Sequence, residues 1–260
     1  MFTTFIAVIS ALGTESAILF LKNKKFSITA SSIISGLIIG YVLSSDSPWW
    51  IFILASLLAI SSKHLIRIGK RHLFNPAALG IFLSIILFGA SGQWKGTYLW
   101  HILVPAGLYF IFKINKSEVI IGYGLAALGL FAIQAVIQKT PLLNIFGYLS
   151  YFYIFIMLIE PRTTPVKLAG KLIFGAGAAV LIFILTEAGV RFDAELCTLL
   201  VLNAFVPLLN KIPEKEPNMR KIAVFMLVCF FVAFYSVALA HPPSDIIITF
   251  NPQTKILKVV

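Results

Sequence analysis

Long apolar runs alternate with short polar or charged segments along nearly the whole chain. Each run is bounded by charge or by Pro and Gly, and most approach the roughly 20 residues that cross a hydrocarbon core about 30 Å thick. The pattern predicts ten membrane-spanning helices, at residues 2–21, 27–45, 48–62, 74–91, 98–112, 119–138, 142–159, 172–187, 195–210 and 222–240.

The composition supports the same interpretation. Of the 260 residues, 59% are apolar and only 12% are charged, whereas soluble domains carry about 25% charged residues. With a mean hydropathy of +0.96, the chain has more apolar surface than a water-soluble fold can bury. We expect an all-α polytopic membrane protein surrounded by the lipid bilayer.

Basic residues are distributed unevenly between alternate loops. If both termini lie outside, the inner loops hold 16 of the 21 Lys and Arg residues, as the positive-inside rule requires. The tryptophans fall beside outer loops, where an interfacial aromatic belt forms; they are Trp49, Trp50, Trp94 and Trp100. The net charge of +11 therefore orients the protein, and no nucleic-acid partner is expected.

A charged, proline-bearing linker divides the chain. Residues 1–212 form the predicted transmembrane core, and residues 213–221 the cytoplasmic linker. Residues 222–240 form either a last transmembrane helix or a signal-like segment cut after Ala240. Residues 241–260 alternate between apolar and polar around Asn-Pro, as in a β-hairpin, so we expect an extracytoplasmic β-type tail that is either short or a domain truncated at Val260.

An approximate internal symmetry relates two spans that contain asparagine. Asn75 opens the fourth span in FNPAALG, and Asn203 lies in LNAFVPL of the ninth span, five spans later. A five-span offset reverses the direction of a helix, so the two positions would correspond in an inverted five-plus-five repeat.

The stretch KHLIRIGKRHLFNPAALG places a helix-breaking dipeptide at the start of a span. Pro76 suits a first helical turn, where its missing N–H costs nothing, and Asn75 can cap that turn. The pair is either a plain helix start at the membrane surface or a helix N-terminus directed at a polar or anionic ligand.

A second polar stretch, IEPRTTP, follows the seventh predicted span. Glu160 ends the span, and two prolines restrict the connection that carries Arg162, Thr163 and Thr164. Arg162 offers a planar fork suited to a phosphate or a flavin-like edge. The alternative is a solvated inner loop in which Glu160 and Arg162 are paired with each other or with water.

Other polar residues are given structural roles. Glu15, inside the first span, is either functional or paired with Lys22, while His64 and His72 in the basic loop are expected to be solvated. Cys197 and Cys229 lie inside predicted spans without metal-ligand spacing. No metal site is predicted.

Taken in order, three segments resemble the NqrB/RnfD family, membrane subunits of ion-pumping NADH:quinone and ferredoxin:NAD oxidoreductases. They are KHLIRIGKRHLFNPAALG, MLIEPRTTPVKLAGKLIFG and ELCTLLVLNAFVPLLNK. The resemblance covers roughly residues 50–212 and implies a multi-pass protein of a prokaryotic cell membrane. It also implies an inverted five-plus-five core whose interior is associated with flavin and quinone.

One family motif is incomplete here. Members with covalent FMN carry D-x-x-S-G-A-T-P-L, in which the Thr is linked to the flavin, whereas this chain has AVIQKTPLLN. Thr140, Pro141 and Leu142 match the end of that motif, but its Asp, Ser, Gly and Ala are missing. We therefore expect no covalent FMN at Thr140.

The resemblance favours a non-autonomous subunit of a membrane oxidoreductase, with other redox subunits as partners. It would hold a flavin (FMN or riboflavin) or a quinone non-covalently through Asn75, Pro76, Arg162, Thr163, Thr164 and Asn203. Glu160 would serve protonation or ion coupling. Two alternatives stay open: a permease for a small solute or ion on the same fold, and a cofactor-free membrane anchor.

Overall fold

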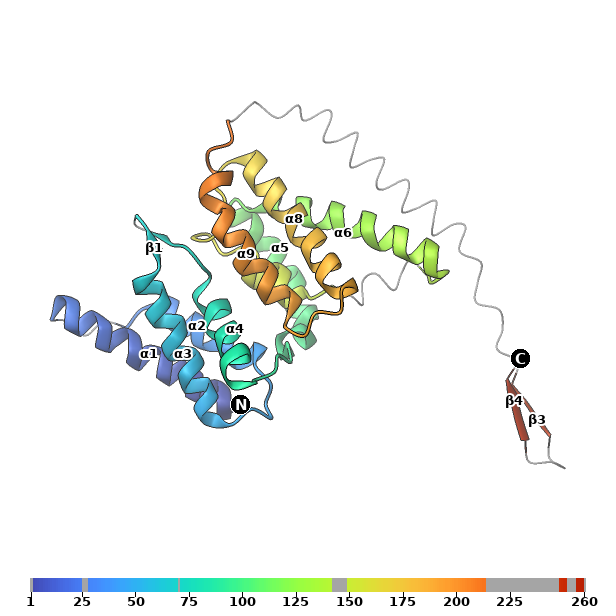
Figure 1. Ribbon diagram of the computed structural model, residues 1–260, viewed down its shortest axis with the longest axis horizontal. Coiled ribbons are helices and arrows are strands. Elements are labelled where there is room, and N and C mark those ends of the chain that lie inside the picture. The colour runs from blue at the N-terminus through green and yellow to red at the C-terminus, as the bar shows by residue number, and fades with distance from the viewer. Residues whose placement is uncertain are drawn as a thin grey trace.

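Helices make up most of the described chain. The computed structural model describes residues 2–24, 28–69, 71–141, 149–213, 248–251 and 256–259. Its long helices are α1 (Phe2–Asn23), α2 (Ala30–Val42), α3 (Trp49–Leu65), α4 (Pro76–Phe88), α5 (Trp100–Lys113), α6 (Ser117–Gln138), α8 (Leu168–Glu187) and α9 (Ala194–Leu209) (Figure 1).

Short elements connect or follow the helices. Strands β1 (Arg67–Ile68) and β2 (Arg71–His72) form a small hairpin in the basic loop, where Gly69 adopts a φ of 60° that favours glycine. A 3₁₀ turn η1 (Lys95–Leu99) precedes α5, and a π-helical segment η3 (Tyr153–Met157) precedes the IEPRTTP loop. In the tail, β3 (Ile248–Asn251) pairs antiparallel with β4 (Ile256–Val259).

Eight of the ten predicted spans coincide with these long helices, with ends that differ by a few residues. The seventh predicted span appears only in its second half, as η3 and the residues beside it, because residues 142–148 lie outside the described part of the chain. The linker after residue 213, the span at 222–240 and the expected cut after Ala240 also lie outside the described residues.

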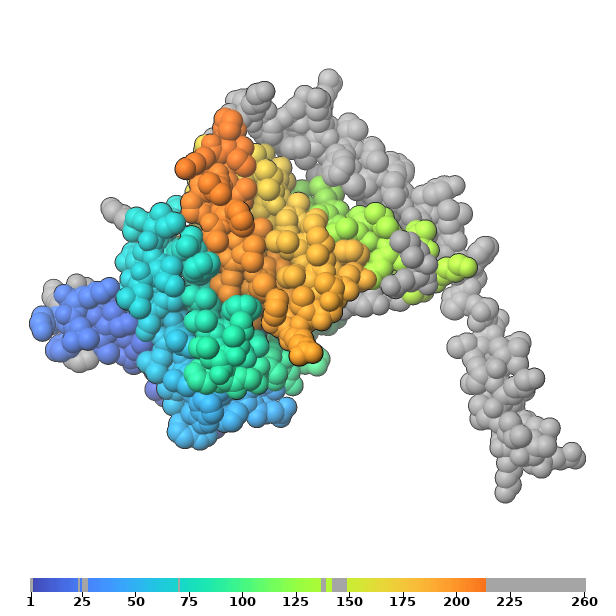
Figure 2. Space-filling model, in the orientation of Figure 1, coloured from blue at the N-terminus to red at the C-terminus, as the bar shows by residue number. Residues whose placement is uncertain are grey.

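The helices pack in two groups that meet along α4 and α9. Helix α3 packs against α1 and α4, whereas α8 packs against α6 and α9 (Figure 1). Two glycines allow especially close approach: a Cβ at Gly80 of α4 would collide with the Ala55 carbonyl of α3, and one at Gly175 of α8 with the Val119 carbonyl of α6. Small residues serve the same purpose where membrane helices cross. Figure 2 shows α9 lying directly against the group formed by α3 and α4.

Hydrogen bonds join the loops and helix ends in two separate sets, one of them rich in basic residues. At the basic end, Lys116 Nζ donates to the Pro165 carbonyl (2.8 Å), Lys171 Nζ donates to the Asn115 carbonyl (2.7 Å), and the Lys22 and His64 side chains meet at 3.5 Å. At the other end, backbone and side-chain hydrogen bonds join residues 44–45 to residues 91–95. Loops that were predicted for the same side of a membrane are thus hydrogen-bonded to one another in each of the two sets.

The architecture is that of a polytopic membrane protein. Among the described residues, three helices are long and apolar enough to cross a bilayer, at Phe2–Lys22, Ser117–Val136 and Leu168–Glu187, and α2, α3, α4 and α9 are shorter apolar helices. Large apolar side chains also stay exposed along the helices, including Phe5, Phe112 and Ile184. Exposed apolar surface of this extent is unfavourable in water and suits a lipid environment.

Candidate functional site

The two asparagines that the sequence singled out are in direct contact. The Asn75 backbone N–H donates to Asn203 Oδ1 at 2.8 Å, and both residues are buried, with 2% and 0% of their surfaces exposed. Asn75 Oδ1 in turn accepts the Ala78 N–H at 3.0 Å, which caps α4. Residues 128 positions apart are thus joined where α4 begins and α9 passes.

Asn203 extends this contact to the IEPRTTP loop. Its Nδ2 donates to the Thr163 carbonyl at 3.0 Å. The Thr163 hydroxyl donates to Glu160 Oε2 at 2.9 Å, and the Thr164 hydroxyl donates to the Glu160 carbonyl at 2.9 Å. Pro207, four residues after Asn203, has no N–H, so the Asn203 carbonyl lacks the hydrogen bond that it would otherwise accept within α9.

The β1–β2 hairpin supplies the last member of the chain of contacts. Its His72 is 4% exposed, and the ring Nε2 lies 3.0 Å from Glu160 Oε1. We call the connected set His72–Glu160–Thr163–Asn203–Asn75 the bridging network. It runs from the loop before α4, through the loop after η3, to α9, and so connects all three segments on which the family resemblance rests.

The position of His72 corrects an expectation. His64 and His72 were both predicted to be solvated, yet His64 Nε2 lies 3.2 Å from Glu15 Oε2, and His72 is buried against Glu160. Glu15 does not depend on Lys22: its Oε1 accepts from Lys63 Nζ at 2.9 Å within the bundle. A carboxylate removed from water needs a charged or donating partner; the last turn of α3 provides it for Glu15, and the β1–β2 hairpin provides it for Glu160.

Most of the predicted ligand residues are occupied within the protein. The Asn75 N–H, both ends of the Asn203 carboxamide and the Thr163 and Thr164 hydroxyls all have protein partners, and Pro76 is buried. Asn203 Oδ1 occupies the Asn75 N–H and Asn75 Oδ1 occupies the Ala78 N–H, so these two donors at the start of α4 are not available to a ligand. These residues fit a flavin or a quinone poorly as direct contacts.

Arg162 is the exception among the predicted ligand residues. It is exposed, and its guanidinium makes no hydrogen bond or ion pair with the described residues. Both of its neighbours in the network are fixed, since Glu160 is held by His72 and Thr163 by Asn203. The loop thus exposes the guanidinium group of Arg162, while Glu160 and Thr163 on either side of it are held by hydrogen bonds.

The buried cation Lys116 also contacts this loop. Lys116, 5% exposed, precedes α6 and donates to the Pro165 carbonyl. Burial, together with repulsion from Lys171 and Arg71, lowers the pKa of Lys116 to about 8, although Glu118 opposes the shift. A pKa of about 8 still leaves the ammonium of Lys116 mostly protonated at pH 7, so that it can donate to the Pro165 carbonyl.

One tryptophan departs from the predicted aromatic belt. Trp49, Trp50 and Trp100 are 58%, 40% and 56% exposed, in line with an interfacial position. Trp94 instead turns inward, packs against Phe152 and Tyr153, and donates its Nε1–H to Asp193 Oδ2 at 2.6 Å. No pattern in the sequence indicated that this residue belongs to a buried polar site at the less basic end of the bundle.

The fold is that of a polytopic helical membrane protein, and buried hydrogen bonds connect three of its separated segments. The chain belongs to the NQR2, RnfD, RnfE family, whose model matches residues 1–98 and 87–219. The resemblance drawn from the three sequence segments is confirmed.

Curated relatives belong to redox complexes. The chain is 29% identical over 142 residues to the D subunit of the ion-translocating oxidoreductase complex of Klebsiella pneumoniae, an alignment covering 53% of this chain and 40% of that protein. It is 22% identical over 265 residues to the D subunit of the proton-translocating ferredoxin:NAD(+) oxidoreductase complex of Clostridium ljungdahlii, covering 80% of each. It is 31% identical over 87 residues to the corresponding protein of Aeromonas hydrophila, covering 32% of this chain and 25% of the relative. The alignments thus span less than half the length of the Klebsiella and Aeromonas proteins.

Proposed function

We propose that this chain is a membrane subunit of an ion-translocating oxidoreductase complex and works in electron transport with other subunits. Its relatives carry that description, and the three segments that resemble the family converge in one buried network. In this proposal the membrane core has ten spans arranged as an inverted five-plus-five repeat, with both termini outside the cell membrane.

The bridging network carries the proposal, and its role is to position and to exchange protons. Glu160 holds three contacts, with His72, Thr163 and Thr164, and 23% of its side chain stays exposed. A carboxylate that is partly exposed and bonded to an imidazole can pass a proton between solvent and the buried chain. Asn75 and Asn203 then act as positioning residues, because they fix the loops that bring His72 and Glu160 together.

A flavin or a quinone would supply the electron chemistry, held non-covalently. The contact that this chain offers to such a group is Arg162, since its donors face outward from a fixed loop, whereas the other predicted ligand residues are occupied. In the proposal Thr140 carries no covalent FMN, because its neighbours lack the small residues of the flavinylation motif; Thr140 itself is exposed, two residues after the end of α6.

The test begins with the visible spectrum of the complex purified through this chain, before and after dithionite. Flavin absorbance that bleaches on reduction, and that is lost on trichloroacetic acid precipitation because the flavin is non-covalent, is the expected result. Arg162→Ala should lower cofactor content, while Arg191→Ala, which removes another exposed arginine at the opposite end of the bundle, should leave it unchanged. A colourless complex without extractable quinone would refute the cofactor part.

The proton role is tested separately in proteoliposomes. Glu160→Gln preserves the shape of the side chain and can still bond His72 and Thr163, but cannot change charge. We expect assembly and electron transfer to continue while coupled ion movement falls by at least about tenfold. Full ion movement in this variant would show that Glu160 has only a structural role.

A further inference from the structure

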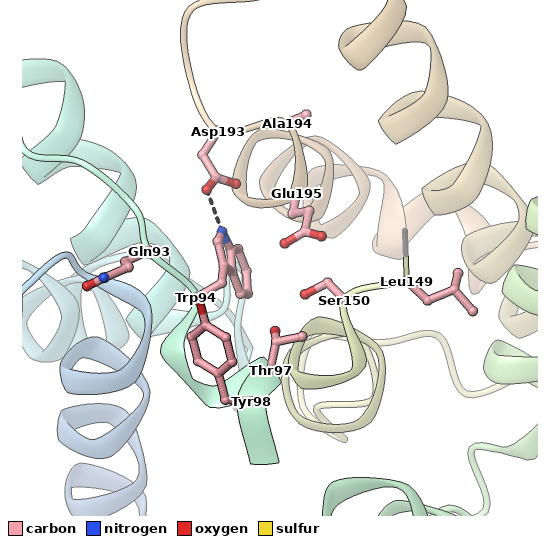
Figure 3. A pocket seen from close by; sticks show the side chains of 9 residues that line it. All are labelled: Gln93, Trp94, Thr97, Tyr98, Leu149, Ser150, Asp193, Ala194 and Glu195. Carbon is pink, nitrogen blue, oxygen red and sulfur yellow. Dashed lines mark hydrogen bonds between the residues drawn. The ribbon is translucent and has the colours of Figure 1, made fainter. Parts of the chain in front are cut away.

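Acidic and basic side chains gather at different places in the described part of the chain. Asp193 and Glu195 line a cavity of about 410 Å³ at the start of α9, and no Lys, Arg or His is among the described residues that line it (Figure 3). We call this space the acidic cavity. A contrasting set of cations surrounds the turn between α5 and α6, and its charge is balanced only in part.

Three basic side chains from separate parts of the chain lie near this turn. Lys116 ends the turn and is 5% exposed, Lys171 lies near the start of α8 and is 8% exposed, and Arg71 belongs to β2. Lys171 Nζ donates to the carbonyl of Asn115, the residue before Lys116, at 2.7 Å. Lys171 and Arg71 are close enough for their charges to lower the pKa of Lys116. We call Arg71, Lys116 and Lys171 the basic cluster.

The basic cluster carries more positive charge than Glu118 neutralises. Glu118 Oε2 accepts from Lys171 Nζ at 3.0 Å, so three cations face this one carboxylate. Lys116 Nζ donates to a neutral acceptor, the Pro165 carbonyl. Arg71 is exposed and makes no hydrogen bond or ion pair with the described residues. A buried cation usually has a charged partner, and an anion beside Lys116 and Arg71 would supply it.

Two long helices begin at the basic cluster and add to its positive potential. Lys116 is the N-cap of α6 and Lys167 is the N-cap of α8, and neither side chain makes a capping hydrogen bond to its helix. The N-terminus of a helix carries a partial positive charge, which favours an anion and disfavours a lysine. Capping therefore does not explain the lysines at these two helix starts, whereas a bound anion would.

We propose that the basic cluster binds a phosphate group, and that the head group of an anionic phospholipid supplies it. Lysine binds phosphate as a point charge, and arginine offers a planar fork for two of its oxygens. Basic pockets between membrane helices on the cytoplasmic side recognise such head groups, and the positive-inside rule predicts that side for these loops. Phe112 and Val166, close to the cluster in sequence, are 71% and 55% exposed, so acyl chains have apolar side chains to pack against. The inference goes beyond the redox role, since lipid binding needs neither cofactor nor electron.

Thermal unfolding of the purified full chain in detergent tests the site. Dioleoyl phosphatidylglycerol is titrated, with dioleoyl phosphatidylcholine as the control, because it has the same acyl chains and a phosphodiester but no net charge. We expect a saturable rise in melting temperature with phosphatidylglycerol and a much smaller rise with phosphatidylcholine. Sodium phosphate, compared with sodium chloride at equal ionic strength, shows whether a soluble phosphate can replace the lipid, and we expect a weaker effect.

Two variants should shift the affinity in opposite directions. Arg71→Gln removes one phosphate-binding cation and should weaken the apparent affinity for phosphatidylglycerol about fivefold. Glu118→Gln removes the carboxylate that opposes the anion and should strengthen the affinity. Arg191→Gln is the matched control, because Arg191 is exposed in the loop between α8 and α9, beyond the far end of α8, and should leave the affinity unchanged.

Arg71 is exposed on a short hairpin, so the comparison with Arg191→Gln holds even if Glu118→Gln does not fold. If sodium phosphate stabilises the chain through Arg71 while the two lipids act alike, the site is supported and its ligand is a soluble phosphate. Equal effects of the two lipids without an effect of phosphate, or equal affinities in the wild type, Arg71→Gln and Arg191→Gln, would overturn the proposal. No electron donor is present, so this outcome is independent of the redox test.

Discussion

Replacing Asn203 by Ala should loosen the contact between the two helix groups. Asn203 is fully buried and holds two main-chain groups, the Asn75 N–H and the Thr163 carbonyl. Alanine would leave both of them without a partner. Each unsatisfied buried group costs about 1–3 kcal/mol, although polar contacts measured between membrane helices average only about 0.6 kcal/mol. We therefore expect a loss of about 2–4 kcal/mol.

The assay is thermal unfolding in detergent, followed by tryptophan fluorescence, for which the chain has four tryptophans. A loss of this size corresponds to a fall in melting temperature of roughly 4–16 °C. Ser84→Ala is the matched control: Ser84 is equally buried in α4, but its hydroxyl donates only to the Gly80 carbonyl of its own helix, at 2.8 Å.

Ser84→Ala should therefore shift the melting temperature far less than Asn203→Ala. If the two variants melt together, or if Asn203→Ala melts with the wild type, the bridging network does not stabilise the contact between α4 and α9. The positioning role assigned to Asn203 would then have no energetic basis.

Three further predictions concern other contacts. Gly175→Ala should destabilise the α6–α8 pair, because the new methyl group meets the Val119 carbonyl, whereas Gly124→Ala on α6 meets open space and should be tolerated; unfolding in dodecyl sulfate compares the two. Glu15→Gln should lower the free energy of unfolding by about 3–5 kcal/mol, because the buried Lys63 would lose its charged partner. Adding Lys63→Met should restore much of that stability in the same unfolding assay. If the double variant is no more stable than Glu15→Gln, this reasoning is wrong. Lys116 has a pKa of about 8 in the folded protein, below its ordinary value of 10.5, so the unfolded state binds more protons between about pH 8 and 10.5, and the contribution of Lys116 to the melting temperature should rise with pH across that window. Lys116→Gln should remove this contribution. If the pH dependence of the melting temperature is the same in the variant and the wild type, the lowered pKa is wrong.

The sequence predicted the helices well because each span depends on a local property. An apolar run of sufficient length bounded by charge specifies a membrane helix without reference to its neighbours. The sequence singled out Asn75 and Asn203 only as corresponding positions of a predicted repeat, and it did not indicate the direct hydrogen bond between them.

The side-chain partners could not be predicted in the same way. His72 was expected to be solvated, and its burial depends on the β1–β2 hairpin and on a glutamate 88 residues away. The pairing of Glu15 with Lys63 likewise spans 48 residues. Such contacts depend on helix packing, for which a hydropathy pattern carries no information.

The acidic cavity was missed for a similar reason. Asp193 caps α9 and Glu195 lies in its first turn, and two acids at the start of an apolar span could have attracted attention. Ser150, Thr97 and the inward-turned Trp94 come from other segments and have no distinctive sequence signal.

The bond between Asn75 and Asn203 also limits how the molecule can move. Transporters that work by alternating access rock one repeat against the other around a central site. In this protein, separating α4 from α9 would break the Asn75–Asn203 and Asn203–Thr163 hydrogen bonds together and leave buried main-chain groups without partners. These two hydrogen bonds therefore favour a fixed contact between α4 and α9 over a rocking motion at this position.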